Sequence, residues 1–128
     1  MESVLEVNAK NWEKLILKSN LLVVVEFWHE SCQSCKSLAP IYSEVAIEYK
    51  DKIKLTKLNV LTSKDNREIA VKYGVMSTPT LIFFCDGTPI ATKIGRDGFE
   101  TKEQLKQLIN EMIHKCTENK ESPHFQSK

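Results

Sequence analysis

Apolar residues recur along the chain with two different spacings, and these spacings predict strands and helices in turn. Residues 21–28 read Leu-Leu-Val-Val-Val-Glu-Phe-Trp, which is apolar on both faces and rich in β-branched side chains. Such a run is typical of a central strand that helices cover on both sides. Shorter runs of the same kind predict further strands at residues 4–7, 53–60, 80–85 and 89–94.

Helical spacing separates these strands. Residues 34–49 place apolar side chains every three or four positions, and Pro40 inside this segment is expected to kink the helix. Asp86-Gly87 is a hairpin signal between the last two strands. The other predicted helices are a short one capped by Asn8, one at 63–73, and one that begins with a capping box at Thr101–Gln104 and ends at 116.

The element order is strand, helix, strand, helix, strand, helix, strand, strand, helix. Strands that alternate with helices pair in parallel, and the final hairpin adds an antiparallel edge. We therefore predict the α/β class, with a mixed central sheet of four to five strands and helices on both faces. Residues 1–116 form one domain, and the polar tail 117–128 is expected to be disordered.

Charge and hydropathy narrow the classes of partner. The chain has 128 residues, with 18 basic and 17 acidic side chains interleaved along it. This balance favours neither nucleic acid nor an anionic membrane as a partner. There is no visible secretory signal, and no apolar run is long enough to span a bilayer. We expect a monomer that works in the cytoplasm.

The chain contains four cysteines, which are too few for a disulfide-dense secreted scaffold. A zinc site would need all four of them, and there is no second Cys-x-x-Cys, so neither a metal nor a cofactor is expected. Cys85 ends an apolar run and Cys116 extends an apolar stripe. We expect each of these two to be a small buried hydrophobic residue.

Cys32-Gln33-Ser34-Cys35 lies where the central strand gives way to a helix. Backbone N–H groups at a helix N-terminus stabilise an anion, so Cys32 is expected to have a lowered thiol pKa and to be the nucleophile. Ser34 is expected to place a backbone N–H near the Cys32 sulfur. Cys35 lies one turn further in, where it can resolve a mixed disulfide by closing the intramolecular one.

Two charged residues share strand parity with apolar neighbours. Glu26 has the parity of Val24 and Trp28, and Lys57 has that of Leu55. A lone buried carboxylate is costly unless it is paired or protonated. Either both residues lie at strand ends and reach solvent, or they face one another beneath the cysteine pair.

The chain resembles the thioredoxin family over nearly its whole length, apart from the tail. The motifs that carry this resemblance occur in the family's order and spacing. They are residues 24–40 (Val-Val-Glu-Phe-Trp-His-Glu-Ser-Cys-Gln-Ser-Cys-Lys-Ser-Leu-Ala-Pro), Lys57-Leu58-Asn59-Val60, Lys72-Tyr73-Gly74-Val75, Ser77-Thr78-Pro79-Thr80-Leu81 and Asp86-Gly87.

The resemblance implies a thioredoxin fold with a cis peptide bond at Pro79, although proline considered alone favours trans. It also implies a thiol–disulfide oxidoreductase that reduces protein disulfides, using electrons from a thioredoxin-reductase-type or other dithiol donor. An acid at the position of Glu26, usually Asp, helps to move the proton of the resolving cysteine, and Lys57 accompanies it. The residues expected to contact substrate are Trp28, Gln33, Ser34, Thr78, Pro79 and Gly95.

The sequence departs from the family pattern around the cysteines. Ser31, Gln33 and Ser34 stand where the common motif has Trp, Gly and Pro. These changes leave two alternatives open, namely an oxidase or isomerase on the same fold, or a binding module with redox-inert cysteines.

Overall fold

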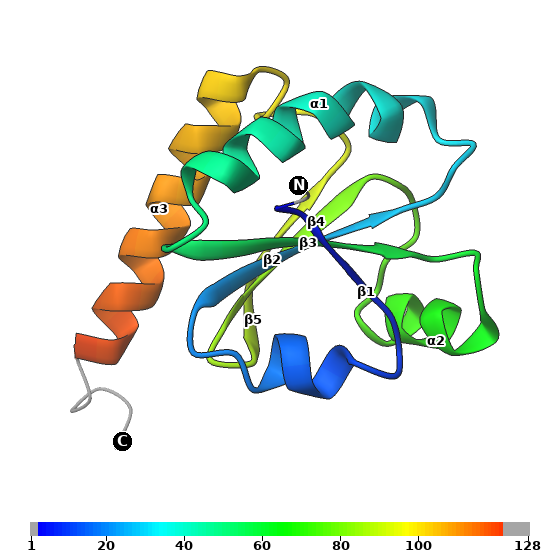
Figure 1. Cartoon of the computed structure of the whole chain (residues 1–128), viewed down its shortest axis with the longest axis horizontal. Coiled ribbons are helices and arrows are strands. Elements are labelled where there is room, and N and C mark those ends of the chain that lie inside the picture. Colours follow the sequence, from blue (N-terminus) through cyan, green and yellow to red (C-terminus); the bar gives the residue numbers. More distant parts are fainter. Residues whose placement is uncertain (1–2, 122–128) are drawn as a thin grey trace.

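The computed structural model describes residues 3–121, and of 119–121 only the backbone. Its centre is a five-stranded sheet in which β1, β2 and β3 are parallel, while β4 and β5 run antiparallel to their neighbours (Figure 1). The predicted fold class is thus confirmed. Across the sheet the strands are β1 (Leu5–Val7), β3 (Ile53–Asn59), β2 (Leu22–Trp28), β4 (Thr80–Cys85) and β5 (Thr88–Ile94).

Helices cover both faces of this sheet (Figure 1). Successive residues of β2 point to opposite faces, so Val24 joins one apolar core and Val25 joins the other. The first core lies under α1 and α3, and the second lies under η1, a short π-helix, and α2. The helices are η1 (Glu13–Leu17), α1 (Gln33–Glu48), α2 (Lys64–Lys72) and α3 (Lys102–Glu121).

Local sequence signals account for most of the element ends. Asp86 and Gly87 both have positive φ, as a tight hairpin between β4 and β5 requires. A Cβ on Gly87 would collide with the Leu17 carbonyl oxygen, so only glycine fits there. Thr101 and Gln104 form the predicted capping box, with each side chain accepting from the other residue's backbone N–H.

Two predicted helix ends are wrong. The Asn8 side chain accepts from the backbone N–H groups of Lys10 and Asn11, so it closes a local turn before η1 and does not cap it. At the other end of the chain, α3 continues to Glu121, beyond the predicted end at 116. Residues 117–121 contain no glycine or proline to stop the helix. The remainder of the predicted disordered tail, 122–128, lies outside the described residues.

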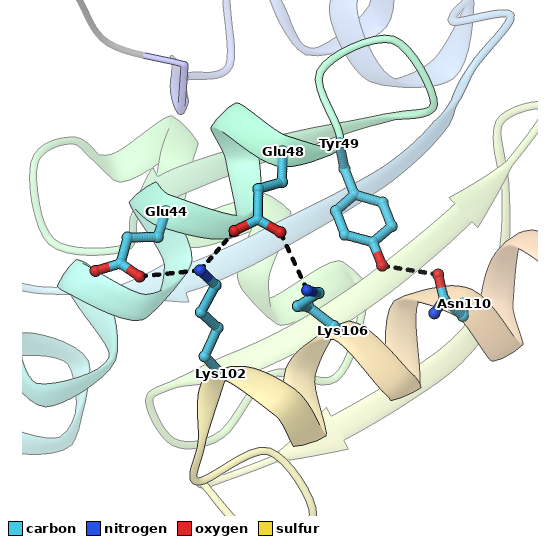
Figure 2. Close-up of polar contacts among 6 residues, drawn as sticks. All are labelled: Glu44, Glu48, Tyr49, Lys102, Lys106 and Asn110. Atoms are coloured by element: carbon cyan, nitrogen blue, oxygen red, sulfur yellow. Dashed lines mark hydrogen bonds and ion pairs between the residues drawn. The ribbon is translucent and has the colours of Figure 1, made fainter.

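Polar contacts line the seam between α1 and α3 (Figure 2). Lys102 pairs with both Glu44 and Glu48, and Lys106 pairs with Glu48 as well. The Tyr49 hydroxyl, just past the end of α1, is 2.8 Å from the side-chain oxygen of Asn110. Exposed ion pairs contribute little to stability, so the apolar residues beneath this seam hold α3 in place.

A disulfide joins Cys85, at the end of β4, to Cys116 in α3, with their Cα atoms 5.7 Å apart. Both residues are buried, as predicted, but the expectation that each is simply a small hydrophobic residue is wrong. The helix packs across the sheet so that two cysteines 31 residues apart come within bonding distance. The link ties α3 covalently to the first core.

This disulfide is expected to stabilise the fold by restricting the unfolded chain. Closing a loop of 31 residues corresponds to about 3–4 kcal/mol in the free energy of unfolding. In a Cys32→Ser/Cys35→Ser background, urea unfolding with and without reductant is expected to differ by that amount. Adding Cys85→Ala and Cys116→Ala to the same background is expected to abolish the effect of reductant. Identical unfolding curves before these additions would show that the two thiols are not linked.

Candidate active site

Cys32 occupies the position just before α1, and its Sγ accepts a 3.1 Å hydrogen bond from the Cys35 backbone N–H. A disulfide joins the two cysteines, whose Cα atoms are 5.2 Å apart. Cys35 is the more buried, at 3% exposure against 8% for Cys32. The backbone N–H that donates to Sγ belongs to Cys35, so the prediction that Ser34 places this N–H near the sulfur is wrong. Ser34 and Gln33 lie exposed on the first turn of α1.

A tight turn brings the chain from β2 to this helix. The Cys32 backbone N–H donates to the His29 carbonyl at 3.2 Å, and the Ser31 N–H donates to His29 Nδ1 at the same distance. These two bonds occupy N–H groups that would otherwise need water. The turn thereby sets the Cys32 sulfur at the N-terminus of α1.

The cis bond implied by the resemblance is present between Thr78 and Pro79. The backbone N–H of Gly95 donates to the Pro79 carbonyl at 2.9 Å, so the structure brings these two predicted substrate residues together. Thr78 and His29 line one cavity of about 230 Å³, which also includes Met76. Sequence reasoning missed Met76, whose 95% exposure is unusual for an apolar side chain and gives no periodic signal.

A second cavity, of about 280 Å³, lies beneath Cys35 and is also lined by Glu26, Trp28 and Lys57. Glu26 is 3% exposed, and its Oε2 is buried with no hydrogen-bond partner among the described residues. Burial raises the pKa of Glu26 to about 7, while attraction from Lys57 and then from Arg96 opposes this rise. The carboxyl group therefore titrates close to neutral pH.

Lys57 is the register partner of Glu26, so the two side chains lie on the same face of the sheet. Its ammonium, however, lies 4.7 Å from the centre of the Trp28 ring and 4.0 Å from the carboxylate of Glu6. Glu26 and Lys57 therefore lie on the same face beneath Cys35, as expected. The carboxylate within ion-pair distance of Lys57, however, belongs to Glu6. Sequence reasoning missed Glu6, which lies on an edge strand and is half exposed.

Tyr42 of α1 closes the inner wall of the cavity. Its hydroxyl donates to the Thr56 carbonyl at 2.6 Å, and it is 1% exposed. Burial and the neighbouring Glu26 raise the pKa of Tyr42 well above its usual range. Tyr42 therefore stays neutral, which leaves Glu26 as the titrating acid on this wall.

The arrangement joins a cysteine at a helix N-terminus, a second cysteine one turn inward, and a buried carboxyl group beside the second one. Such a set can carry out thiol–disulfide exchange with proton transfer. Among residues 3–121, no group of three or more histidine, cysteine or acidic side chains is arranged to hold a metal ion. The fold and site define a thiol–disulfide oxidoreductase.

Comparison with known proteins gives the family. The Thioredoxin family model matches residues 3–111. Thioredoxin of Pseudomonas aeruginosa is 40% identical over 112 residues, covering 88% of this chain and 98% of that protein. Thioredoxin of Buchnera aphidicola from Acyrthosiphon pisum is 35% identical over 114 residues, covering 89% and 100%. Thioredoxin of Bacillus subtilis is 41% identical over 92 residues, covering 72% and 83%. The chain belongs to the thioredoxin family.

No helix within the described part of the chain is long and apolar enough to cross a membrane.

The raised pKa of Glu26 makes stability depend on pH. Between pH 4.5 and about 7 the folded state holds a proton on Glu26 that the unfolded state has released, so stability falls as pH rises through this range. The loss is roughly 3 kcal/mol, from 1.36 kcal/mol for each unit of pKa difference. Glu26→Gln removes this loss.

We therefore expect Glu26→Gln to unfold at higher urea concentration than the unsubstituted protein at pH 8, with the gap narrowing as pH falls to 4.5. Glu30→Gln, which changes an exposed acid in the turn before Cys32, is the matched control for the loss of one negative charge. A gap that stays constant across this range would contradict the raised pKa.

Proposed function

We propose that the protein reduces disulfides in other proteins, with Cys32 as the nucleophile and Cys35 as the resolving thiol. The observation that carries this proposal is the N–H donated to Cys32 Sγ at the start of α1, because that donor stabilises a thiolate on Cys32. Cys35 lies deeper, so its sulfur is less able to attack the disulfide of a large substrate directly.

The exchange proceeds in two steps. The Cys32 thiolate attacks one sulfur of the substrate disulfide, forming a mixed disulfide while the other substrate sulfur leaves and takes up a proton. Cys35 then loses its proton and attacks Cys32 Sγ, so the second substrate thiol is released and the Cys32–Cys35 disulfide forms. A dithiol donor, such as a thioredoxin-reductase-type protein, returns the pair to the reduced form.

Glu26 accepts the proton of Cys35 in the second step. Both residues line the same cavity, and Glu26 Oε2 has no hydrogen-bond partner within residues 3–121. The cavity has room for water, so a water molecule can relay the proton if the two groups do not touch. A pKa of about 7 makes Glu26 a base that is available at neutral pH and not too weak to accept a thiol proton.

Substrate contacts are assigned to Trp28, Gln33, Ser34, Thr78, Pro79 and Gly95. The 230 Å³ cavity beside Thr78 supports a partly apolar substrate, because Met76, Leu61 and Val71 line it and all three are strongly exposed. Exposed apolar side chains of this kind suit an extended segment of a partially unfolded protein.

Lys57 acts through its charge on the resolving step, in which Glu26 accepts the proton of Cys35.

The place of action is also part of the proposal. The matched relatives named above are bacterial thioredoxins. We assign this protein to the cytoplasm as a monomer. Both cysteines of the Cys85–Cys116 disulfide are buried, which limits the access of low-mass thiols to this bond. Cell fractionation and the molar mass in solution test these two assignments.

The roles of the two cysteines predict opposite outcomes. Cys32→Ser is expected to abolish insulin reduction, since the attacking sulfur is gone. Cys35→Ser is expected to accumulate a mixed disulfide through Cys32, visible by mass spectrometry under non-reducing conditions. The double variant Cys85→Ala/Cys116→Ala serves as the control and is expected to retain reductase activity. Reductase activity in Cys32→Ser would refute the assignment.

The role of Glu26 predicts a change in one step only. In Glu26→Gln the resolution of a preformed mixed disulfide is expected to slow by 10-fold or more at pH 7, since positioned proton transfer contributes roughly 10²–10⁴-fold. The attack of Cys32 on a small disulfide is expected to stay within about twofold. Stopped-flow measurement of both rates separates the two. Equal slowing of both steps would assign Glu26 to packing instead.

A further inference from the structure

Three charged residues lie side by side across the sheet on its α1 face. The strand register pairs Glu6 of β1 with Lys57 of β3, and pairs Lys57 with Glu26 of β2. One ammonium thus stands between two carboxylates, of which one is on the sheet edge and the other at its centre. The side on which Lys57 rests decides whether Glu26 has an ion-pair partner.

Lys57 rests on the outer side. Its Nζ is 4.0 Å from Glu6 Oε1, and the ring of Trp28 lies beneath it at 4.7 Å. The side chains of Lys57 and Glu6 are 34% and 54% exposed, whereas Glu26 is 3% exposed. An ammonium that pairs with Glu6 keeps part of its hydration, which a pairing with Glu26 inside the cavity would remove. The Trp28 face adds a cation–π attraction on the same side.

Trp28 also contacts Glu6. Burial raises the pKa of Glu6, while attraction from Lys57 and the contact with the Trp28 side chain lower it. This contact is not a regular hydrogen bond. The buried Nε1 of Trp28 has no hydrogen-bond partner within the described part of the chain. Glu6, Lys57 and Trp28 therefore form one cluster, of which Lys57 and Trp28 also line the cavity of Glu26.

We propose that Glu6 is a positioning residue of the active site, which holds the Lys57 ammonium over the Trp28 ring and so keeps it from pairing with the Glu26 carboxylate beside Cys35. The proposal rests on the function proposed above, because it concerns the base of the resolving step. A carboxylate that is paired with an ammonium is a weaker base. By holding the Lys57 ammonium on the side of Glu6, Glu6 preserves the proton affinity that Glu26 needs to deprotonate Cys35.

Other charged and titratable groups also lie near Glu26 or act on it, and the variants leave Arg96, Tyr42 and Cys35 unsubstituted. Arg96, after β5, lowers the pKa of Glu26, as Lys57 does, whereas Glu6 raises it. Tyr42 is hydrogen-bonded and neutral, and the thiol of Cys35 does not titrate while the disulfide is closed. The groups that line or act on this site are Glu6, Glu26, Cys35, Lys36, Tyr42, Lys57 and Arg96.

The experiment titrates Glu26 directly, by the ¹³C NMR shift of its carboxyl carbon in the oxidised full-length protein. In Glu6→Gln, Lys57 is released toward Glu26, and the proton affinity of Glu26 is expected to fall at least about threefold, a pKa decrease of about 0.5. Glu13→Gln is the matched control, since it removes the same charge from an exposed ion pair on η1, over the other face of the sheet. An unchanged or raised Glu26 pKa in Glu6→Gln would overturn the proposal.

A second pair of variants separates positioning from a direct effect of the Glu6 charge. In a Lys57→Met background, Glu6→Gln is expected to shift the Glu26 pKa by less than half as much as it does with Lys57 present. An equal shift in both backgrounds would show that Glu6 acts without Lys57, which also overturns the proposal. The titration needs no substrate or turnover, so its failure is distinct from a failure of the Cys32 and Cys35 variants.

Discussion

The desolvation of the Glu26 carboxylate governs the chemistry that this fold can support. β2 lies at the centre of the sheet with helices on both faces, so every residue from Leu22 to Phe27 is buried. The acid in that strand, Glu26, lines the cavity beneath Cys35. The cost of charging it there is what moves its pKa to about 7. Lys57 opposes this rise through its charge, but the carboxylate within ion-pair distance of its ammonium is that of Glu6.

The two cysteines lie in different environments, although only one turn of α1 separates them. Cys32 lies at the entrance of α1, where a backbone N–H favours negative charge on its sulfur. Cys35 lies inside, next to a group that holds or releases a proton. Cys32 therefore lies beside a hydrogen-bond donor at the helix entrance, and Cys35 lies deeper, in the cavity that also holds Glu26. The asymmetry arises from the position of the helix start rather than from the identity of Gln33 and Ser34.

Periodicity and turn chemistry predict the element order, the hairpin at Asp86-Gly87, the capping box at Thr101 and the entry of Cys32 into a helix. These features depend on residues close together in the sequence. The pairing of Cys85 with Cys116 does not, because it requires the packing of α3 across the sheet. The contact of Glu6 could not be predicted for the same reason, since its partner Lys57 lies on another strand about 50 residues away. The polar composition of residues 117–121 favours disorder, but this segment lacks helix breakers and continues α3 to Glu121.

The disulfide between Cys85 and Cys116 turns the intervening chain into a covalent ring that contains β5 and most of α3. A single cleavage of the backbone anywhere inside that ring leaves the two pieces attached to one another. The strand that carries Gly95 to the Pro79 carbonyl is part of the ring, so a nicked molecule keeps this wall of the site tethered in place. A cut in the hairpin between β4 and β5 would therefore release no fragment from the molecule.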